Sequence, residues 1–340
     1  MFSGLLSHSA APAADFSRLQ RASITFRDVA KRYGDHQVLN AINLQVEPGE
    51  VVAILGPSGS GKSTLIRLIN QLESLSGGEI LIDGKPTSRL SGSALRQLRS
   101  RVGFVFQQFN LYAHLTAQEN ITLALERVHG WEKSAAQARA LALLRQVGLE
   151  EKAQQMPAQL SGGQQQRVGV ARALAADPEV LLMDEPFGAL DPVTREALQQ
   201  EMLRIHRLLG RTIVLVTHDI DEALRLADHL VLMDGGEVVQ QGAPLEMLLR
   251  PKNSFVQTFF GRSELGVRLL SLCEVGDYLR PDERLAGEGL TVTMTLREAL
   301  SQFVARRCEK LPVVDAEGRP CGTLHFADLL RQEMSHEGAS

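Results

Sequence analysis

Short apolar runs alternate with longer amphipathic segments along the first two thirds of the chain. Some runs alternate apolar and polar positions as half-buried strands do, and others are continuous, β-branched and typical of strands buried on both faces. The predicted strands are 24–28, 39–46, Val51–Leu55, 180–183 and Thr212–Val216. The segments that favour helix are 62–72, 116–148 and 194–209, the last preceded by Asp191 as a cap and Pro192. Strands that alternate with helices predict a parallel α/β sheet.

The pattern changes after about residue 260. Residues 261–289 contain Gly, Pro, Glu and Arg with weak periodicity, so we expect a linker there. A small β-α-β pattern follows, with strands at 290–294, 311–314 and 323–326, a helix at 295–307 and a turn at 315–318. The expected domains are a flexible tail over 1–22, a large domain over 23–260, the linker, a small α+β domain over 290–334, and a tail over 335–340.

Composition narrows the class of protein. The chain has 340 residues, 44% of them hydrophobic and 22% charged, so we expect a packed core, and disorder as the main state is excluded. The formal net charge of -4 gives no general attraction to nucleic acid. The apolar runs are far shorter than the ~20 residues that cross a bilayer, and residues 1–22 lack the pattern of a signal peptide. Cys273, Cys308 and Cys321 form no CxxC pair, so we expect reduced thiols of a cytosolic protein.

A glycine-rich loop stands between the third predicted strand and the helix after it. It fits the pattern G-x-x-x-x-G-K-[ST]. Glycines let backbone N–H groups turn toward phosphate oxygens, and the start of the next helix adds partial positive charge. We expect Lys62 to reach the β- and γ-phosphates and the Ser63 hydroxyl to ligate Mg²⁺. The candidate nucleotide-binding residues of this loop are Gly56, Pro57, Ser58, Gly59, Ser60, Gly61, Lys62, Ser63 and Thr64.

Candidate catalytic side chains follow two other predicted strands. Asp184 and Glu185 come at the end of strand 180–183, and successive side chains of a strand point in opposite directions. Asp184 suits a Mg²⁺ site, because Mg²⁺ prefers carboxylates together with phosphates, and Glu185 suits a general base that polarises the attacking water. His218 follows strand Thr212–Val216, at the end where ligands bind in open α/β sheets, and could contact the γ-phosphate.

One further motif makes the pattern specific. The sequence Leu-Ser-Gly-Gly-Gln at 160–164 stands just before a helical segment with Arg167 and Arg172. Together with the glycine-rich loop and Asp184-Glu185, it closely resembles the ATP-binding cassette (ABC) ATPases over about residues 24–261. The resemblance implies a P-loop NTPase fold with a RecA-like core and a helical subdomain at about 108–172. It also implies that the chain hydrolyses ATP with Mg²⁺.

The same resemblance assigns further roles. Tyr33 would stack on adenine, Gln107 would sense Mg²⁺ and the membrane partner, and His218 would act as a switch histidine. Residues 188–191, which end in Asp191, would cross a dimer interface. The residues expected to face the ATP of the other subunit are Ser161, Gly162, Gly163 and Gln164. Two ATP molecules would then lie between two copies of the chain in a head-to-tail homodimer.

The partners implied by the resemblance are separate chains. Two copies would join two integral-membrane permease subunits at the cytoplasmic face of the inner membrane, served indirectly by a solute-binding protein, with no nucleic acid partner. The segment 109–114 would meet the permease, with Tyr112 as the main contact. Ordinary core packing of its apolar side chains is the alternative.

The motifs split between two kinds of importer. Residues 107–111, 119–120 and 161–167 look like polar amino acid importers. Residues 186–192, 217–223 and 259–262 look like importers of glycine betaine and choline. Residues 291–334 resemble one cystathionine-β-synthase (CBS) module, a regulatory appendage of the betaine-type ATPases. This favours uptake of a quaternary amine such as glycine betaine or choline. Polar amino acid uptake is the alternative, and a non-transport ATPase is a remote one.

The CBS-like module leaves its own ligand open. His325 stands where the family more often has Ser or Thr for a ribose or phosphate contact, whereas Asp328 fits the family. The module could gate the cassette by sensing a nucleotide or ionic strength. It could instead serve only in packing or dimerisation, without a ligand.

Overall fold

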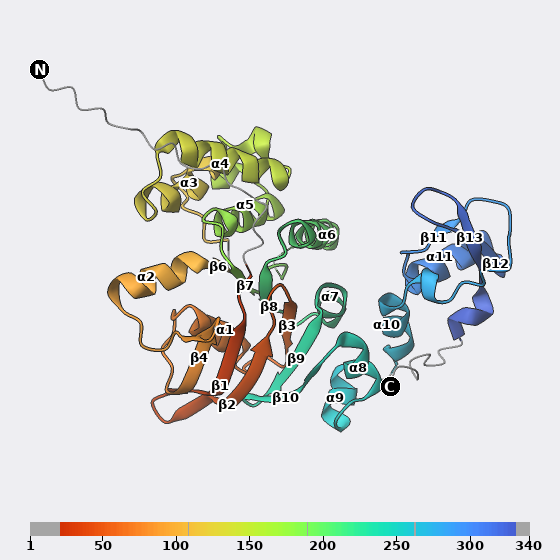
Figure 1. The fold of residues 1–340 in the computed structure, drawn as a ribbon, viewed down its shortest axis with the longest axis horizontal. Coiled ribbons are helices and arrows are strands. Elements are labelled where there is room, and N and C mark those ends of the chain that lie inside the picture. Colours follow the sequence, from red (N-terminus) through yellow and green to blue (C-terminus); the bar gives the residue numbers. More distant parts are fainter. Residues whose placement is uncertain (1–20, 108, 189, 262, 331–340) are drawn as a thin grey trace, which may run out of the picture. The chain divides into compact units, whose positions relative to one another are not determined.

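The computed structural model describes residues 21–107, 109–188, 190–261 and 263–330 (Figure 1). The chain divides into two compact units, Met1–Gln241 and Gly242–Ser340. Each unit has its own sheets and its own apolar core, and together they have the mixed α/β architecture that the sequence predicts. The tails expected over 1–22 and 335–340 lie almost entirely outside the described residues.

The central sheet of the first unit consists mostly of parallel strands. Its strands are, in spatial order, β10 (Glu237–Gly242), β9 (His229–Asp234), β3 (Val51–Leu55), β8 (Thr212–Val216), β7 (Val180–Asp184) and β6 (Val102–Val105). The pairs β9–β3, β3–β8, β8–β7 and β7–β6 are parallel. Every residue of β3, β7 and β8 is buried, as their continuous apolar runs predict. The carboxyl ends of β6, β7 and β8 therefore meet at one edge of the sheet.

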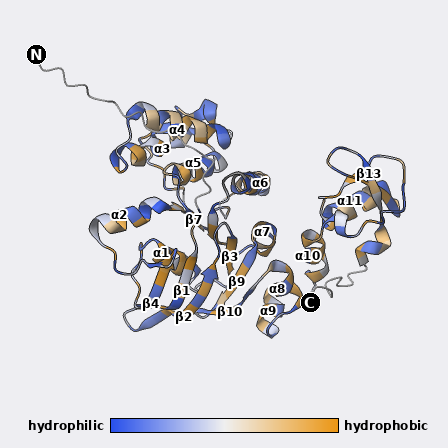
Figure 2. Ribbon diagram, viewed as in Figure 1, coloured by the Kyte–Doolittle hydropathy of each residue, from blue (hydrophilic) through white to orange (hydrophobic). Residues whose placement is uncertain are grey.

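An antiparallel sheet completes the strand layers of this unit. Its strands are, in spatial order, β2 (His36–Val46), β1 (Ile24–Tyr33), β4 (Gly77–Ile82) and β5 (Lys85–Pro86). Strand β1 runs beyond the predicted residue 28, because register shifts along it keep it paired with β2 as far as Tyr33. Phe26, Ile54 and Leu65 belong to one core formed by both sheets and α1 (Lys62–Ile69). In Figure 2 hydrophobic colouring gathers on these strands.

The helical subdomain is built from α3 (Ala117–Arg127), α4 (Lys133–Gln146) and α5 (Gly162–Leu174), which pack on one another, and α5 contacts β6 (Figure 1). The predicted helical stretch 116–148 is two helices, because the chain turns at Gly130, where φ is +67°. Capping boxes begin α3 at Thr116 and α5 at Ser161. The other helical elements of the unit are α2 (Gly92–Arg101), η1 (Glu150–Lys152), η2 (Pro157–Gln159), α6 (Pro192–Leu209) and α7 (Ile220–Leu226).

The second unit has a small sheet with the order β11-β12-β13. Strand β11 (Leu290–Thr291) pairs parallel with β12 (Lys310–Val314), which pairs antiparallel with β13 (Pro320–His325). The predicted β-α-β pattern is confirmed, although β11 is shorter than the predicted strand 290–294. The helical elements of the unit are α8 (Pro244–Leu249), α9 (Ser254–Phe259), α10 (Leu265–Leu272), η3 (Val275–Asp277), α11 (Leu296–Arg306) and η4 (Phe326–Leu330).

The segment 261–289, expected to be a linker, is instead partly folded into the second unit. It contains α10 and η3, and Val275 is buried while Leu270 and Tyr278 pack against the core of this unit. The first unit also ends at Gln241 rather than near residue 260. The sequence pattern does not predict helix α10, because eight residues give too short an apolar pattern and no side-chain cap marks the start of the helix.

Two other expectations concern the whole chain. Cys273, Cys308 and Cys321 are free thiols, as predicted. Among the described residues, no helix combines the length and the apolar character needed to span a bilayer.

Candidate active site

The glycine-rich loop connects β3 to α1 and needs glycine at both of its ends. Gly56, Gly59 and Gly61 have φ of +147°, +81° and +96°, a region that L side chains rarely adopt. A Cβ atom on Gly56 would overlap the carbonyl oxygen of Met233, and one on Gly61 would overlap the Leu39 side chain. The loop therefore passes close to its neighbours, with Pro57, Ser58 and Gly59 exposed at its tip.

Two buried polar groups inside the loop fit an anionic ligand. The Lys62 ammonium donates to the carbonyl oxygens of Gly56 at 2.9 Å and Pro57 at 2.8 Å. Burial lowers the pKa of Lys62, while the nearby carboxylates of Glu185 and Asp184 favour its charged form. The Ser60 hydroxyl is buried and has no hydrogen-bond partner among the described residues. A phosphate group would give both a charged partner.

Asp184, at the end of β7, joins the loop to the sheet. It is 2% exposed, and its Oδ1 accepts a hydrogen bond from the Ser63 hydroxyl at 2.7 Å. Its Oδ2 accepts one from the Arg67 guanidinium at 2.9 Å. The structure thus brings together Ser63 and Asp184, both predicted as Mg²⁺ ligands. Arg67 was missed, although its place four residues after Ser63 on α1 puts it on the same helix face.

The three candidate catalytic residues meet around one oxygen atom. Gln107, after β6, donates from Nε2 to Oε2 of Glu185 at 2.9 Å. His218, after β8, has its Nδ1 3.5 Å from the same oxygen. The backbone of Glu185 is left-handed, with φ of +46°, and its N–H donates to the carbonyl of Val216. Parallel strands therefore deliver Gln107, Glu185 and His218 to one place, as the positions of Glu185 and His218 after predicted strands indicate. Gln107 follows β6, a strand that is not among those predicted from the sequence.

Tyr33 lies at the end of β1 with its side chain accessible. The residue is 46% exposed, and the Lys31 ammonium lies 4.5 Å from the centroid of its ring. Burial and a hydrogen bond with Glu73 raise the pKa of Tyr33, whereas a hydrogen bond with Thr64 opposes this rise. The contact with Thr64 places the ring next to the start of α1. Such a ring offers a surface on which a flat base can stack.

The motif at 160–164 forms the beginning of α5. The Ser161 hydroxyl accepts from the Gln164 N–H at 3.4 Å, and the Gln164 side chain accepts from the Ser161 N–H at 2.9 Å. A Cβ atom on Gly163 would overlap the methyl group of Thr194 on α6. A Cβ atom on Gly162 would make only ordinary contact with the ring of Phe109. The motif itself thus provides partners for the backbone N–H groups of Ser161 and Gln164 at the helix start.

Asp191 caps α6, which runs beside α5. Its carboxylate accepts from the Thr194 N–H at 3.0 Å, and the bonds from Thr194 lower the pKa of Asp191. Within the described ranges, no hydrogen bond or ion pair joins Asp191 or Ser161–Gln164 to the glycine-rich loop. The predicted site residues therefore form two groups in one chain. Ala189, part of the predicted interface loop, lies outside the described residues.

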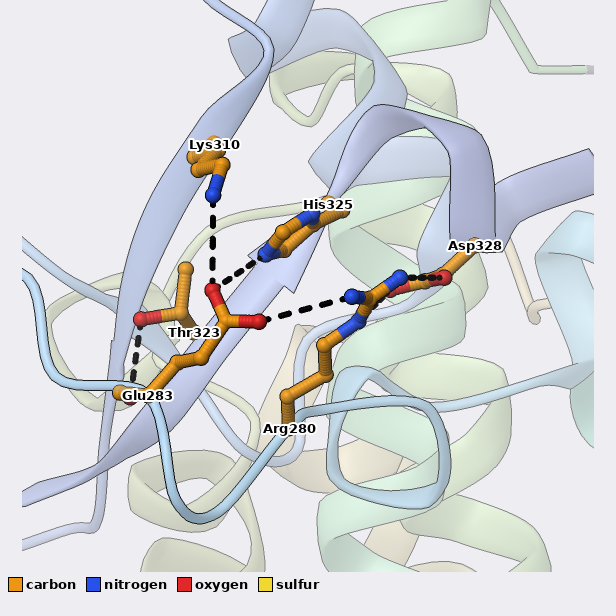
Figure 3. Close-up of polar contacts among 6 residues, drawn as sticks. All are labelled: Arg280, Glu283, Lys310, Thr323, His325 and Asp328. Carbon is orange, nitrogen blue, oxygen red and sulfur yellow. Dashed lines mark hydrogen bonds and ion pairs between the residues drawn. The ribbon is translucent and has the colours of Figure 1, made fainter.

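The second unit carries a cluster of polar side chains of its own (Figure 3). Arg280 donates to both carboxylate oxygens of Asp328, at 2.9 and 2.7 Å. Glu283 lies 2.7 Å from Nε2 of His325 and 3.5 Å from the Lys310 ammonium. His325 and Asp328, the positions singled out by the CBS resemblance, are thus paired with residues of the expected linker. No sequence pattern singles out Arg280 or Glu283 in advance.

Comparison with known proteins agrees with this geometry. The model of the ABC transporter family matches residues 39–188, and the CBS domain model matches 289–335. The glycine betaine uptake system ATP-binding protein YehX of Escherichia coli (strain K12) is 58% identical over 90% of this chain and 99% of its own length. The choline transport ATP-binding protein OpuBA of Bacillus subtilis (strain 168) is 41% identical over 86% of this chain and 76% of its own.

A solved structure extends the likeness to three dimensions. A dimeric ATP-binding cassette in a post-hydrolysis state, bound to ADP and Pi, is 40% identical with a TM-score of 0.59. The match covers 65% of this chain and 98% of that one. The chain thus shares both sequence and fold with ATP-binding cassettes. It also has the glycine-rich loop, the acidic end of β7 and the motif at the start of α5. The chain belongs to the ABC transporter family, as an ATP-binding protein with a C-terminal CBS domain.

Proposed function

We propose that this chain is the ATP-hydrolysing subunit of an importer for glycine betaine, choline or a related quaternary amine. The observation that carries the proposal is the 58% identity with YehX over nearly the full length of both chains. That match spans 308 residues, more than the first unit contains, so the likeness is not confined to the ATP-binding motifs. Identity of this extent favours the betaine type over the polar amino acid type.

In this proposal the residues around Glu185 carry out hydrolysis. Lys62 and the backbone N–H groups of the glycine-rich loop hold the β- and γ-phosphates. Glu185 orients the attacking water and accepts its proton, while the water oxygen bonds to the γ-phosphorus and the bond to the ADP oxygen breaks. Gln107 and His218 keep the Glu185 carboxylate in place. Their contacts with one oxygen of Glu185 support these roles.

Ser63 and Asp184 are the residues that would hold Mg²⁺, with Gln107 as a further ligand. Hydroxyl and carboxylate oxygens are the donors that Mg²⁺ prefers, and their hydrogen bond at 2.7 Å supports a shared site. When bound, the ion would neutralise charge on the phosphate oxygens. Tyr33 would stack on the adenine ring, in keeping with its exposed aromatic face.

The proposed assembly is a head-to-tail homodimer. Ser161–Gln164 and Asp191 of one copy would complete the nucleotide site of the other. Their lack of polar contacts with the glycine-rich loop of the described chain supports this arrangement, as does the dimeric state of the similar cassette bound to ADP and Pi. The dimer would join two permease chains at the cytoplasmic face of the inner membrane. A solute-binding protein would deliver the solute.

The test is ATP hydrolysis by the chain reconstituted with its permease and solute-binding protein. Glycine betaine, choline and polar amino acids would each be added at matched ionic strength. Stimulation by a quaternary amine is the expected result. Stimulation by amino acids alone would overturn the proposed substrate class but leave the ATPase role in place. An ATP hydrolysis rate that changes neither with the permease nor with the solutes would overturn the proposed role in an importer.

A further inference from the structure

A buried carboxyl group lies directly beneath the turn that carries His218. Glu222 is the third residue of α7 and is only 5% exposed. Its Oε2 accepts a hydrogen bond from Gln199 Nε2 of α6 at 3.3 Å, and Gln199 is itself buried. Its Oε1 is buried and has no hydrogen-bond partner within the described part of the chain. Burying an incompletely paired acid costs free energy, so the position calls for an explanation.

The turn above Glu222 is held by a chain of hydrogen bonds. The N–H of Asp219 donates to the Thr217 hydroxyl at 3.0 Å, and the N–H of Glu222 donates to Asp219 Oδ1 at 3.0 Å. The Thr217 side chain also lies against the Glu222 carboxyl group. Thr217 in turn is anchored to β3, since its N–H donates to the carbonyl of Ile54. His218 stands between these residues, with 65% of its side chain exposed.

The same network reaches the loop that ends in Asp191. Arg195 of α6 lies 3.4 Å from Asp219 Oδ2 and donates to the carbonyl of Leu190 at 3.2 Å. Leu190 belongs to the predicted interface loop, and Asp219 begins the helix that contains Glu222. A movement of the Leu190 loop or of Asp219 would therefore change the position of the turn that carries His218.

Capping does not explain why residue 222 is an acid. Asp219 already caps α7 through the backbone N–H of Glu222, so the helix start is satisfied without the Glu222 side chain. The carboxyl group instead points at Gln199 and Thr217. These two contacts fill the space between α6 and the turn, where an apolar residue would leave the Gln199 amide unpaired.

We propose that Glu222 is a positioning residue for ATP hydrolysis, whose buried carboxyl group supports the Thr217–Asp219 turn and so holds the His218 imidazole against Glu185. The inference rests on the proposed function, because it assumes that His218 acts in hydrolysis. It adds a residue that does not touch the nucleotide. It acts through the 3.5 Å contact between His218 Nδ1 and Glu185 Oε2.

The protonation of Glu222 gives the proposal a specific signature. Burial is the main cause that raises the pKa of Glu222 to about 7, and the Asp219 charge adds to it. Hydrogen bonds from Thr217 and Gln199 and the charge of Arg195 act in the opposite direction. The charged groups that face Glu222 are therefore Asp219 in its own turn and Arg195 on α6. Above its pKa, Glu222 would place a second negative charge next to Asp219 and strain the turn.

The experiment measures ATP hydrolysis by the reconstituted transporter as a function of ATP concentration and pH. Glu222→Ala removes the support, and we expect kcat to fall ~10- to 100-fold with little change in KM for ATP, as expected for a misplaced catalytic group. Glu222→Gln keeps the size and cannot ionise. It should retain most of the activity at low pH and lose the fall in kcat that the wild type shows as pH rises through about 7. Glu196→Gln, an exposed acid on α6, is the matched control.

A double variant separates this inference from the proposed function. If Glu222 acts through His218, His218→Ala and the pair His218→Ala, Glu222→Ala should be equally impaired. Additive losses, or a pH profile of Glu222→Gln that matches the wild type, would overturn the positioning role alone. Full activity of His218→Ala would overturn the proposed role of His218 and this inference with it. Should Glu222→Ala fail to fold, the pH profile of Glu222→Gln decides.

Discussion

The ammonium group of Lys62 donates to two neutral carbonyl groups of its own loop, and among the described residues it has no hydrogen bond to a carboxylate. A phosphate oxygen carries negative charge and attracts the ammonium more strongly than a neutral carbonyl oxygen does, so a phosphate group can displace these carbonyls. The Ser60 hydroxyl of the same loop is buried and has no hydrogen-bond partner within the part of the chain that the structure describes. A bound nucleotide would therefore improve on the contacts that these two residues make.

Glu185→Gln should separate nucleotide binding from hydrolysis. The amide oxygen can still accept the hydrogen bond from Gln107, but the side chain can no longer take a proton. We expect ATP turnover to fall ~10²–10⁴-fold, the usual contribution of a general base. ATP should remain bound after gel filtration. The control is Glu201→Gln, an acid on α6 that pairs with Arg204. Equal turnover of the two variants would contradict the general-base role.

A site residue can be predicted from the sequence only when the residues next to it in the chain form a recognisable pattern. Asp184, Glu185 and His218 could be predicted because each follows a continuous apolar run that is a buried strand. Arg67 could not, because its partner Asp184 lies 117 residues away and only the fold brings them together. Glu222 shows the same limit, since its environment depends on α6 packing beside α7.

At the scale of elements, α5 and α6 approach each other at one glycine. A Cβ atom on Gly163 would overlap the Thr194 methyl group. Gly163→Ala should therefore destabilise the chain by about 1–3 kcal/mol, the usual cost of overpacking. Thr194→Ser removes that methyl group and keeps the backbone N–H that Asp191 binds.

The double variant tests this contact by denaturant unfolding. Gly163→Ala with Thr194→Ser should recover most of the lost free energy of unfolding. Gly162→Ala, at a position where a Cβ atom makes only ordinary contact with Phe109, is the control and should change little. If the double variant is as unstable as Gly163→Ala, a cause other than the clash with Thr194 is responsible.

The segment 280–283 is bound to β13 through the polar cluster of the second unit (Figure 3). Arg280 and Thr323 exchange both backbone hydrogen bonds, and the Thr323 hydroxyl donates to the Glu283 carbonyl at 2.9 Å. The hydrogen bond with His325 and the charges of His325 and Lys310 lower the pKa of Glu283. A lowered folded pKa means that this carboxylate stabilises the fold above its unfolded pKa of about 4.3. The contribution is lost as the pH falls through the folded value.

Glu283→Gln should therefore destabilise the fold of the second unit at neutral pH but not in acid. We expect faster hydrogen exchange of residues 320–325 than in the wild type at pH 7, and equal exchange once corrected for intrinsic rates below the folded pKa. Glu317→Gln, an exposed acid in the turn before β13, is the control. A difference that persists unchanged into acid would contradict the ionic contribution of Glu283.

Elements with long, regular patterns could be predicted, and short ones could not. Strands β3 and β8 have the predicted bounds, because they are continuous apolar runs in a parallel sheet. Strand β1 continues past a bulge at Asp28, whose φ of +48° breaks the alternation of side chains. Helix α10 lacks a side-chain cap and is only eight residues long, so its packing, not its sequence pattern, fixes it.

At the scale of the whole molecule, the boundary between the units decides where the chain can be cut. The expected linker would allow a cut anywhere in 261–289. The structure assigns α10 and η3 to the second unit, where Val275 is fully buried in the apolar core and Leu270 packs against that core. The apolar residues that cover them come after residue 289, in β11, α11 and β12.

A chain ending at residue 289 should therefore expose apolar surface, whereas one ending at Gly242 should not. Exposing a side chain of the size of Leu or Val to water costs about 1.5–3 kcal/mol of free energy. Self-association would bury this surface again, so the longer fragment should associate. We expect the 1–289 fragment to bind more ANS and to elute earlier in size-exclusion chromatography than the 1–242 fragment. Substituting Leu270 and Val275 by serine in the longer fragment should reverse both effects. If the two fragments behave alike without those substitutions, α10 and η3 find their cover elsewhere, and the domain boundary belongs after them.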